Sequence, residues 1–170
     1  MRSAQMLAGT LLAAMNSLAG PAANAADLST REQLTMVAKI ASGFAAFAGG
    51  EDNAVALVYS LREGAAVQLV YPGADKQDLP RVLAIEPPTG PMEWHDVRMA
   101  LMLGRDALMA VGVLRPGAAQ LHAALLGGDA MVPGGRVVSF RGVLRMRADG
   151  LNWGRIASER FQRAAVARVE

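Results

Sequence analysis

The sequence predicts a single mainly helical domain of the α+β class, with four to six helices and one small β-hairpin. Across most of the chain, apolar residues recur every three or four positions, which is the spacing of one helix face. Glycines or Gly-Gly pairs follow several of these segments, as is typical where helices end. Only residues 66–86 combine two short β-rich runs with turn residues between them. Because 52% of the 170 residues are hydrophobic, the composition excludes a chain that is disordered throughout.

The N-terminal residues have the composition of a secretory signal peptide. Arg2 precedes an uncharged run over residues 4–18, and Ala23-Asn24-Ala25 then places small residues where a signal peptidase cleaves. We therefore predict a cleavable signal peptide over residues 1–25 and a mature domain over residues 26–170 that is periplasmic or secreted. The apolar run is shorter than the roughly 20 residues that span a bilayer, so no membrane span is expected after cleavage. An N-terminal anchor that stays attached is the alternative.

Two helices joined at a Gly-Gly turn are predicted to open the mature domain. Residues 29–32 have the Ser-Thr-Arg-Glu pattern of a capping box, so a first helix is expected from there to Gly49-Gly50. A second helix should begin near Asp52 and end at Gly64. The residues expected to face the core are Leu34, Val37, Ala41, Phe44 and Ala48 on the first helix, and Val55, Val58 and Leu61 on the second.

The hairpin is expected next, with strands over residues 66–71 and 81–85. Pro72-Gly73 and Leu79-Pro80 flank the segment between them and supply turn residues. An isolated hairpin is only marginally stable in water, so this one should pack against the helices.

Four further helices are predicted after the proline-rich segment 87–91. The first covers about 91–111 with Thr89 as its cap, and the second runs from Pro116 to Gly127-Gly128. Residues 129–135 are expected to form a loop before a third helix over 140–149, which Ser139 caps. Asn152 caps the last helix. The residues expected in the core are Val97, Leu101, Leu108, Val111, Leu121, Leu125, Leu126, Trp153, Ile156, Ala157 and Phe161.

Three stretches resemble an uncharacterised family of small exported bacterial proteins. They are residues 47–50 with 53–64, residues 87–92 and residues 142–157. In that family a segment similar to Leu-Arg-x-x-Gly-Met-Gly-Trp-Gly-x-Ile-Ala closes the domain, and here Leu151-Asn152 replaces its Met-Gly pair. Glu93-Trp94-His95-Asp96-Val97 stands where the family has Gly-Tyr-Gly-Asn-Val. The resemblance implies export and one domain, and it implies no activity, cofactor or catalytic residue.

The absence of cysteine excludes several kinds of site, and the distribution of charge bears on possible partners. Without cysteine, the chain has no disulfide, no cysteine-ligated metal and no thiol nucleophile. Residues 26–96 carry 5 basic and 10 acidic side chains, whereas residues 97–170 carry 11 basic and 5 acidic ones. We expect these opposite charges to pair within one fold, and an anionic partner of the second half is the alternative.

Residues 143–161 resemble a helix-turn-helix, because a basic helix ends at Gly150 and an Asn-capped helix follows. Eight arginines between Arg136 and Arg168 would suit phosphate contacts. The predicted export opposes a nucleic-acid partner, so we interpret the segment as an ordinary helical hairpin with Trp153 as a core anchor.

A methionine-rich stripe is the only metal candidate. At helical spacing one arc contains Met92, His95, Met99, Met102, Asp106 and Met109. Thioether and imidazole groups suit Cu(I), and His95, Met99 and Met102 would be its centre. Methionine is also the adaptable filler of cores and binding surfaces, so packing or partner binding is the preferred interpretation and no metal is assigned.

The sequence thus favours an exported, cofactor-free protein that acts by binding or structural association, with an unknown protein or envelope component as partner. No nucleophile, base or phosphate-binding loop is recognisable, so no catalytic residue is assigned. A small envelope hydrolase that uses Glu93 and Asp96 is the first alternative. A helix-turn-helix nucleic-acid binder is the second, if the signal peptide is misread.

Overall fold

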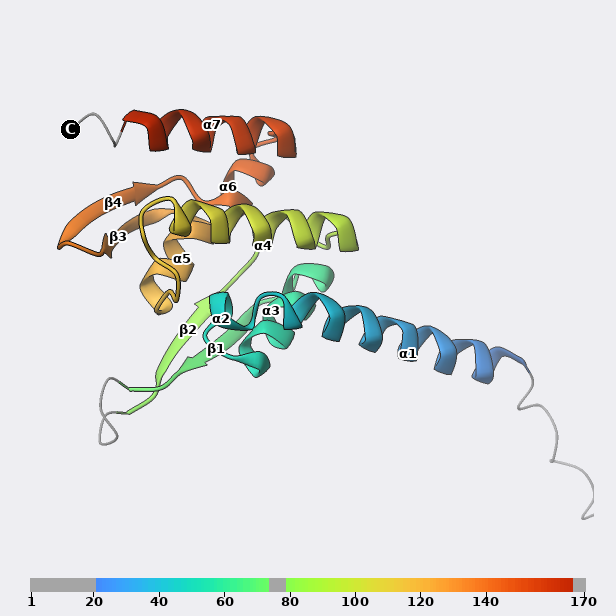
Figure 1. Cartoon of the computed structure of the whole chain (residues 1–170). Coiled ribbons are helices and arrows are strands. Elements are labelled where there is room, and N and C mark those ends of the chain that lie inside the picture. Colours follow the sequence, from blue (N-terminus) through green and yellow to red (C-terminus); the bar gives the residue numbers. More distant parts are fainter. Residues whose placement is uncertain (1–20, 74–78, 167–170) are drawn as a thin grey trace, which may run out of the picture. The chain divides into compact units, whose positions relative to one another are not determined.

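The computed structural model describes residues 21–73 and 79–166, which contain seven helices and four strands in a mixed α+β arrangement (Figure 1). The predicted α+β class is confirmed, whereas the prediction of only one hairpin and at most six helices was wrong. The chain separates into two units, one that ends at Leu34 and one from Thr35 to Glu170. The apolar run of the predicted signal peptide lies outside the described residues.

Helix α1 (Pro21–Ser42) crosses the boundary between the units. Proline is favoured in the first turn of a helix, and the alanine-rich residues that follow are strong helix formers. The helix therefore starts well before Ser29, and the predicted capping box over residues 29–32 is internal to it. Leu34 is exposed, contrary to prediction, whereas Val37 and Ala41 are buried as expected.

Two shorter helices complete the first helical segment. The chain turns at Gly43 and forms α2 (Ala45–Ala48), so the predicted long first helix is in fact interrupted. Helix α3 (Glu51–Glu63) ends at Gly64, whose φ of 66° is the left-handed conformation that favours glycine. Val58 and Leu61 are fully buried, whereas Val55 lies on the exposed side.

The first hairpin pairs β1 (Val67–Tyr71) with β2 (Arg81–Ile85), as predicted. Buried Asn53 of α3 holds the outer edge of β1. Its side-chain amide accepts from the Val70 N–H at 2.9 Å and donates to the Val70 carbonyl at 2.8 Å. It also donates to the carbonyl of Ala48. One side chain thereby joins α2, α3 and the hairpin.

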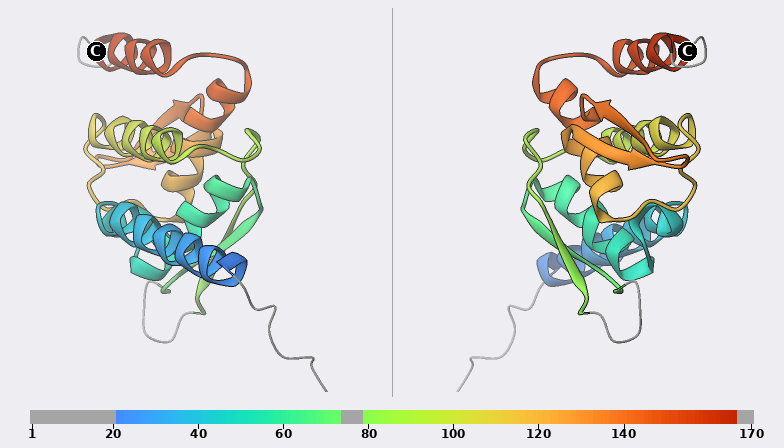
Figure 2. Two further views of the ribbon diagram at one scale, coloured as in Figure 1. Left: turned by 90° about the vertical axis from the view of Figure 1, so that its right-hand side faces the viewer. Right: turned by 90° about the vertical axis from the view of Figure 1, so that its left-hand side faces the viewer.

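Helices α4 (Trp94–Met109) and α5 (Ala118–Leu126) pack against each other. Most of the predicted core of both helices is confirmed: Val97, Leu101, Leu108, Leu121 and Leu125 are buried, whereas Val111 and Leu126 are only half-buried. Thr89 does not cap α4, because its hydroxyl bonds to the carbonyl of Gly90 and the helix begins only after Glu93. Helix α5 lies between the two hairpins and packs against β2 and β3 (Figures 1 and 2).

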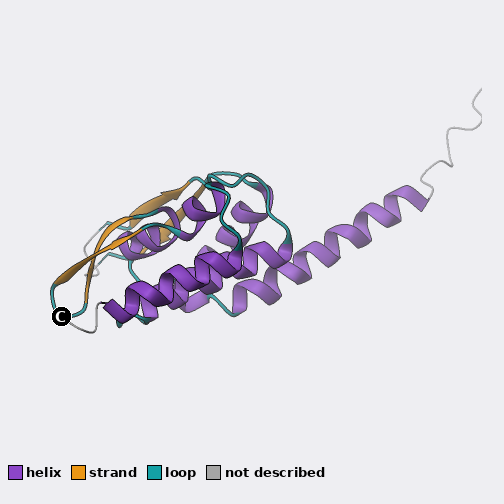
Figure 3. Ribbon diagram, turned by 90° about the horizontal axis from the view of Figure 1, so that it is seen from above, coloured by secondary structure: helices purple, strands orange, loops and turns teal. Residues whose placement is uncertain are grey.

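A second hairpin occupies the region where a loop and a helix start were predicted. Strand β3 (Gly128–Val132) pairs with β4 (Arg136–Phe140), and Val132 lies opposite Arg136. Pro133-Gly134-Gly135 forms the turn, with both glycines at positive φ. The β-branched residues before and after this turn favour strands over a loop. Figure 3 shows the strands of both hairpins gathered on one side of the helices.

The last two helices follow directly. Helix α6 (Val143–Ala148) begins after Gly142, so Ser139 is a strand residue and the predicted cap was wrong. Helix α7 (Trp153–Val166) is capped as predicted, because the Asn152 side chain accepts from the Arg155 N–H at 2.8 Å. Ile156 is buried, Trp153 is half-buried at the edge of the core, and the side chain of Phe161 lies outside the described part.

The hydrophobic core of the second unit is built mainly from aliphatic side chains. The largest fully buried ones come from α1, α3, the first hairpin, α4, α5, α6 and α7. Tyr71 is a polar exception, since its hydroxyl has no hydrogen-bond partner in the described residues. Burial raises the pKa of Tyr71 to about 12. Within the described residues, no helix has both the length and the apolar composition needed to cross a membrane.

Candidate binding site

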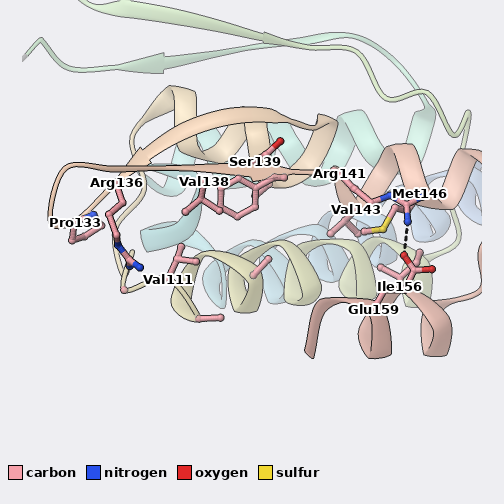
Figure 4. Close-up of a pocket in the computed structure, with 16 residues that line it drawn as sticks. Val111, Pro133, Arg136, Val138, Ser139, Arg141, Val143, Met146, Ile156 and Glu159 are labelled. Atoms are coloured by element: carbon pink, nitrogen blue, oxygen red, sulfur yellow. Dashed lines mark hydrogen bonds and ion pairs between the residues drawn. The ribbon is translucent and has the colours of Figure 1, made fainter. Parts of the chain in front are cut away.

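An apolar pocket of about 540 Å³ lies beside the second hairpin (Figure 4). Its walls come from the C-terminal end of α4, strand β4, and the starts of α6 and α7. The volume lies within the range of pockets that hold small ligands or side chains of a partner. The apolar lining residues used below are Ala110, Val111, Val138, Phe140, Val143 and Met146.

An arginine lies at each end of the pocket, and only one of the two charges is unpaired within the described residues. Figure 4 shows Arg136 at one end and Arg141 with Glu159 toward the other. Arg141 donates to Glu159 at 2.5 Å, so its charge is balanced within the fold. Arg136 is exposed and has no ion pair with any residue in the described ranges. A ligand with an apolar body and an anionic end therefore matches the site.

The strand itself forms one wall of the pocket. Val138, Ser139 and Phe140 all line it, although successive residues of a strand point to opposite faces. A pocket lined by three consecutive residues must run along the edge of the strand as well as over one face. The backbone of β4 is thus part of the site.

A second, smaller and more polar pocket of about 320 Å³ lies near the start of α4. Asp96 is one of its lining residues: one carboxylate oxygen accepts from the Trp153 indole at 2.7 Å, and the other lies 3.7 Å from the Arg147 guanidinium. The same guanidinium stacks over the Trp153 ring at 5.1 Å and donates to the Leu151 carbonyl. These contacts tie α4, α6 and α7 together.

The three stretches that carry the family resemblance meet near this second pocket. Gly64 packs so closely on the backbone of Gly90 that a Cβ atom would overlap it. Arg62 donates to the Met92 carbonyl at 2.9 Å, which fixes the proline-rich segment to α3. Arg147, from the third stretch, lines the pocket together with residues 88–92. Their shared location has a structural explanation, because they bind one another.

The acids proposed for the hydrolase alternative do not converge. Glu93 is exposed and lies 3.9 Å from Arg62, whereas Asp96 is engaged by Trp153 and Arg147. Catalysis by two carboxylates requires both groups to face one substrate position. In the described ranges, no three His, Asp or Glu side chains are grouped to hold a metal ion.

Three of the eight arginines that suggested phosphate binding have partners within the described part of the fold. Arg141 and Arg155 both contact Glu159, and Arg147 is held by Asp96, Trp153 and Leu151. Helices α6 and α7 follow each other with only residues 149–152 between them, so the succession of two helices that the sequence suggested is present. Arg141, Arg147 and Arg155 are therefore engaged in structural contacts, whereas Arg136 has no ion pair within the described residues.

The methionine stripe is divided between core and surface. Met92 is buried and precedes α4, Met99 is half-buried, and Met102 and Met109 are exposed. His95 is exposed on the first turn of α4. The stripe therefore does not form one uniformly buried packing face.

Sequence reasoning named none of the pocket residues as a site. Val138 fell between a predicted loop and a predicted helix, and Phe140 fell at the start of that helix. The other apolar lining residues look like ordinary core positions. The useful signal was the run Met-Val-Pro-Gly-Gly-Arg-Val-Val over residues 131–138, which is typical of a hairpin. The chain matches no family model, no curated protein and no solved structure, so the stated resemblance remains a hypothesis.

Proposed function

We propose that this protein is an exported, non-catalytic binding module that accommodates an apolar group of its ligand in the pocket beside β4. The observation that carries the proposal is the pocket of about 540 Å³ with apolar side chains from α4, β4, α6 and α7. Apolar concave surface that remains exposed to water is costly, and it is common at binding sites.

Two further observations support binding over catalysis. Asp96, the acid that lines the smaller pocket, is already bound by Trp153 and Arg147. The 540 Å³ pocket contains only one carboxylate, that of Glu159, and Arg141 binds it. The site therefore offers shape, apolar surface and a positive end, which are the properties of a binding surface.

The test uses 8-anilinonaphthalene-1-sulfonate, whose aromatic body and sulfonate match the apolar walls and Arg136. We expect saturable binding of one molecule per chain. Ala110→Trp should abolish it, because Ala110 is exposed at the rim and an indole there fills the pocket with little cost to the core. Ala119→Trp is the matched control, since Ala119 is exposed on α5 and does not line the pocket.

Dye binding by the two variants decides whether the pocket is the binding site. Binding that is lost in Ala110→Trp and retained in Ala119→Trp supports the proposal. Equal binding by both variants places the dye elsewhere and overturns it. Thermal unfolding of both variants should match the parent within about 0.5 kcal/mol, the usual range for surface substitutions.

A further inference from the structure

In each hairpin, the edge of the first strand that faces away from its partner strand is hydrogen-bonded by a side-chain amide from the helix before it. The strand is β1 after α3 in the first hairpin and β3 after α5 in the second. In the first hairpin, Asn53 of α3 bonds both the N–H and the C=O of Val70. In the second, Gln120 of α5 donates to the Met131 carbonyl at 2.7 Å. Both devices satisfy backbone groups that would otherwise present a free strand edge.

The outer edge of β4 has no such side-chain partner within the described residues. In an antiparallel pair, opposite residues alternate between those that bond each other and those whose backbone groups point outward. Met131 directs its carbonyl to α5, so Val137, which lies opposite it, directs its N–H and C=O to the outer edge of β4. Ser139, two residues further on, does the same. Within residues 21–73 and 79–166, no hydrogen bond from outside the hairpin reaches Val137 or Ser139.

We infer that the outer edge of β4 is a docking site for an extended segment of a partner protein, which adds a third strand to the second hairpin. This inference rests on the proposed function and names the occupant of the same pocket. Added strands gain affinity from main-chain hydrogen bonds and specificity from alternate side chains. Here every second side chain of the segment would enter the apolar pocket beside Val138 and Phe140.

The opposite face of the hairpin fits the same occupant. Met131 and Val137 form a cross-strand pair, and they are 66% and 65% exposed. A third strand beside Val137 would place its other side chains next to this pair and remove apolar surface from water. Both faces of the added strand therefore meet apolar side chains.

Charge selects a partner other than a second copy of this chain. Arg136 and Arg141 stand at the start and just beyond the end of β4. Antiparallel pairing of two β4 edges would leave Arg136 of each copy without a counter-charge from the other strand, because residues 136–140 contain no acidic side chain. A segment with small or β-branched residues in its centre and an acidic residue at the end beside Arg136 matches instead.

The test measures binding of a fluorescein-labelled peptide, Glu-Val-Thr-Val-Thr-Val-Glu, by fluorescence anisotropy. Ser139→Pro removes the edge N–H without touching the β3 ladder, whereas Ser139→Ala retains it. Val82→Pro is the matched control, because Val82 lies opposite Val70 and so has the same outward backbone orientation on β2. We expect Ser139→Pro to weaken binding at least about tenfold, and Ser139→Ala and Val82→Pro to bind like the parent.

Two methylated peptides test strand pairing directly. One carries N-methyl groups on its three valines and the other on its two threonines, so only one of them blocks the N–H groups that face β4. A slipped register would move the valines out of the pocket. We expect one methylated peptide to lose binding and the other to retain it. Equal binding of both overturns edge pairing.

The remaining outcomes distinguish this inference from the proposed function. If the anionic dye binds the pocket but the peptide does not bind, the proposed function stands and the docking of an extended segment is overturned. If sedimentation shows a dimer of the parent that Ser139→Pro dissociates, the occupant is a second copy and the assignment of a partner protein is overturned. Failure of both dye and peptide overturns both proposals.

Discussion

The indole N–H of Trp153 donates a hydrogen bond of 2.7 Å to Oδ1 of Asp96, joining the first turn of α7 to the first turn of α4. The two residues are 57 positions apart in the chain, and no motif in the sequence couples them. Trp153 is therefore more than the apolar anchor predicted from its helical spacing. Its polar atom fixes where the last helix lies against α4.

A double-mutant cycle tests this bond. Trp153→Phe and Asp96→Ala should show a coupling of about 1 kcal/mol in urea unfolding, since a hydrogen bond to a charged group contributes about 1.5–3 kcal/mol and partial exposure reduces it. Trp94→Phe is the matched control: Trp94 stacks under Arg62 as Trp153 stacks under Arg147. Its coupling with Asp96→Ala should be close to zero. Equal coupling for both tryptophans would contradict the assignment.

Asn53 of α3 is predicted to be the polar side chain on which the first hairpin depends most. Asn53→Ala leaves the Val70 N–H, the Val70 carbonyl and the Ala48 carbonyl without their partner. Unsatisfied buried groups are expensive, so we expect a loss of about 2–4 kcal/mol in the free energy of unfolding, read from the urea midpoint. Gln68→Ala removes an exposed amide of β1 and should change stability by less than about 0.5 kcal/mol. Similar effects of the two substitutions would exclude the edge-binding role of Asn53.

Tyr71 is predicted to make the free energy of unfolding depend on pH in the alkaline range. Its pKa is raised to about 12 by burial, whereas an unfolded tyrosine titrates near its ordinary value of 10.0. Below pH 10 both states keep the proton, and between pH 10 and 12 the unfolded state loses it first. Stability should therefore fall across this window, by at most about 2–3 kcal/mol from this group.

Tyr71→Phe isolates that contribution. It removes a buried hydroxyl that has no partner in the described residues, so stability at pH 7 should be unchanged or slightly higher. The fall between pH 10 and 12 should be shallower in the variant than in the parent when both are followed by urea unfolding. Superimposable pH profiles would show that Tyr71 ionises normally in the folded protein.

Export predicts a processed N-terminus. Mass analysis of the protein purified from its native cells should give a chain that starts at Ala26, because Ala23-Asn24-Ala25 is the expected cleavage site. Ala25→Pro should block processing and leave the full-length mass. A full-length parent chain in the cytosolic fraction would refute export and favour the nucleic-acid alternative.

Local signals predicted several element boundaries correctly. Gly64 ends α3, the turn residues between 72 and 80 join β1 to β2, and Asn152 caps α7, because each feature depends on residues adjacent in the chain. The second hairpin was missed because Gly127-Gly128 and Ser139 also fit a helix stop and a helix cap. Only pairing across the Pro133-Gly134-Gly135 turn decides between the two interpretations.

The pocket could not be predicted from the sequence, and the reason is different. Its walls come from separate elements, and residues such as Val111, Val143 and Ile156 have the same apolar character as the closed core. Whether an apolar residue faces another side chain or an open pocket depends on how the elements pack. The Arg136 charge at its end likewise became informative only once its lack of an ion-pair partner was visible.

The most direct test of the central claim is the map of ligand contacts on the protein. We would record amide chemical shifts of the ¹⁵N-labelled protein during titration with 8-anilinonaphthalene-1-sulfonate. The account predicts that the largest changes fall on the end of α4, on residues 136–143 and on the first turn of α7, and that they are absent in Ala110→Trp. Changes centred on Thr89, Asp96 and Arg147 would place binding in the smaller polar pocket and contradict the account.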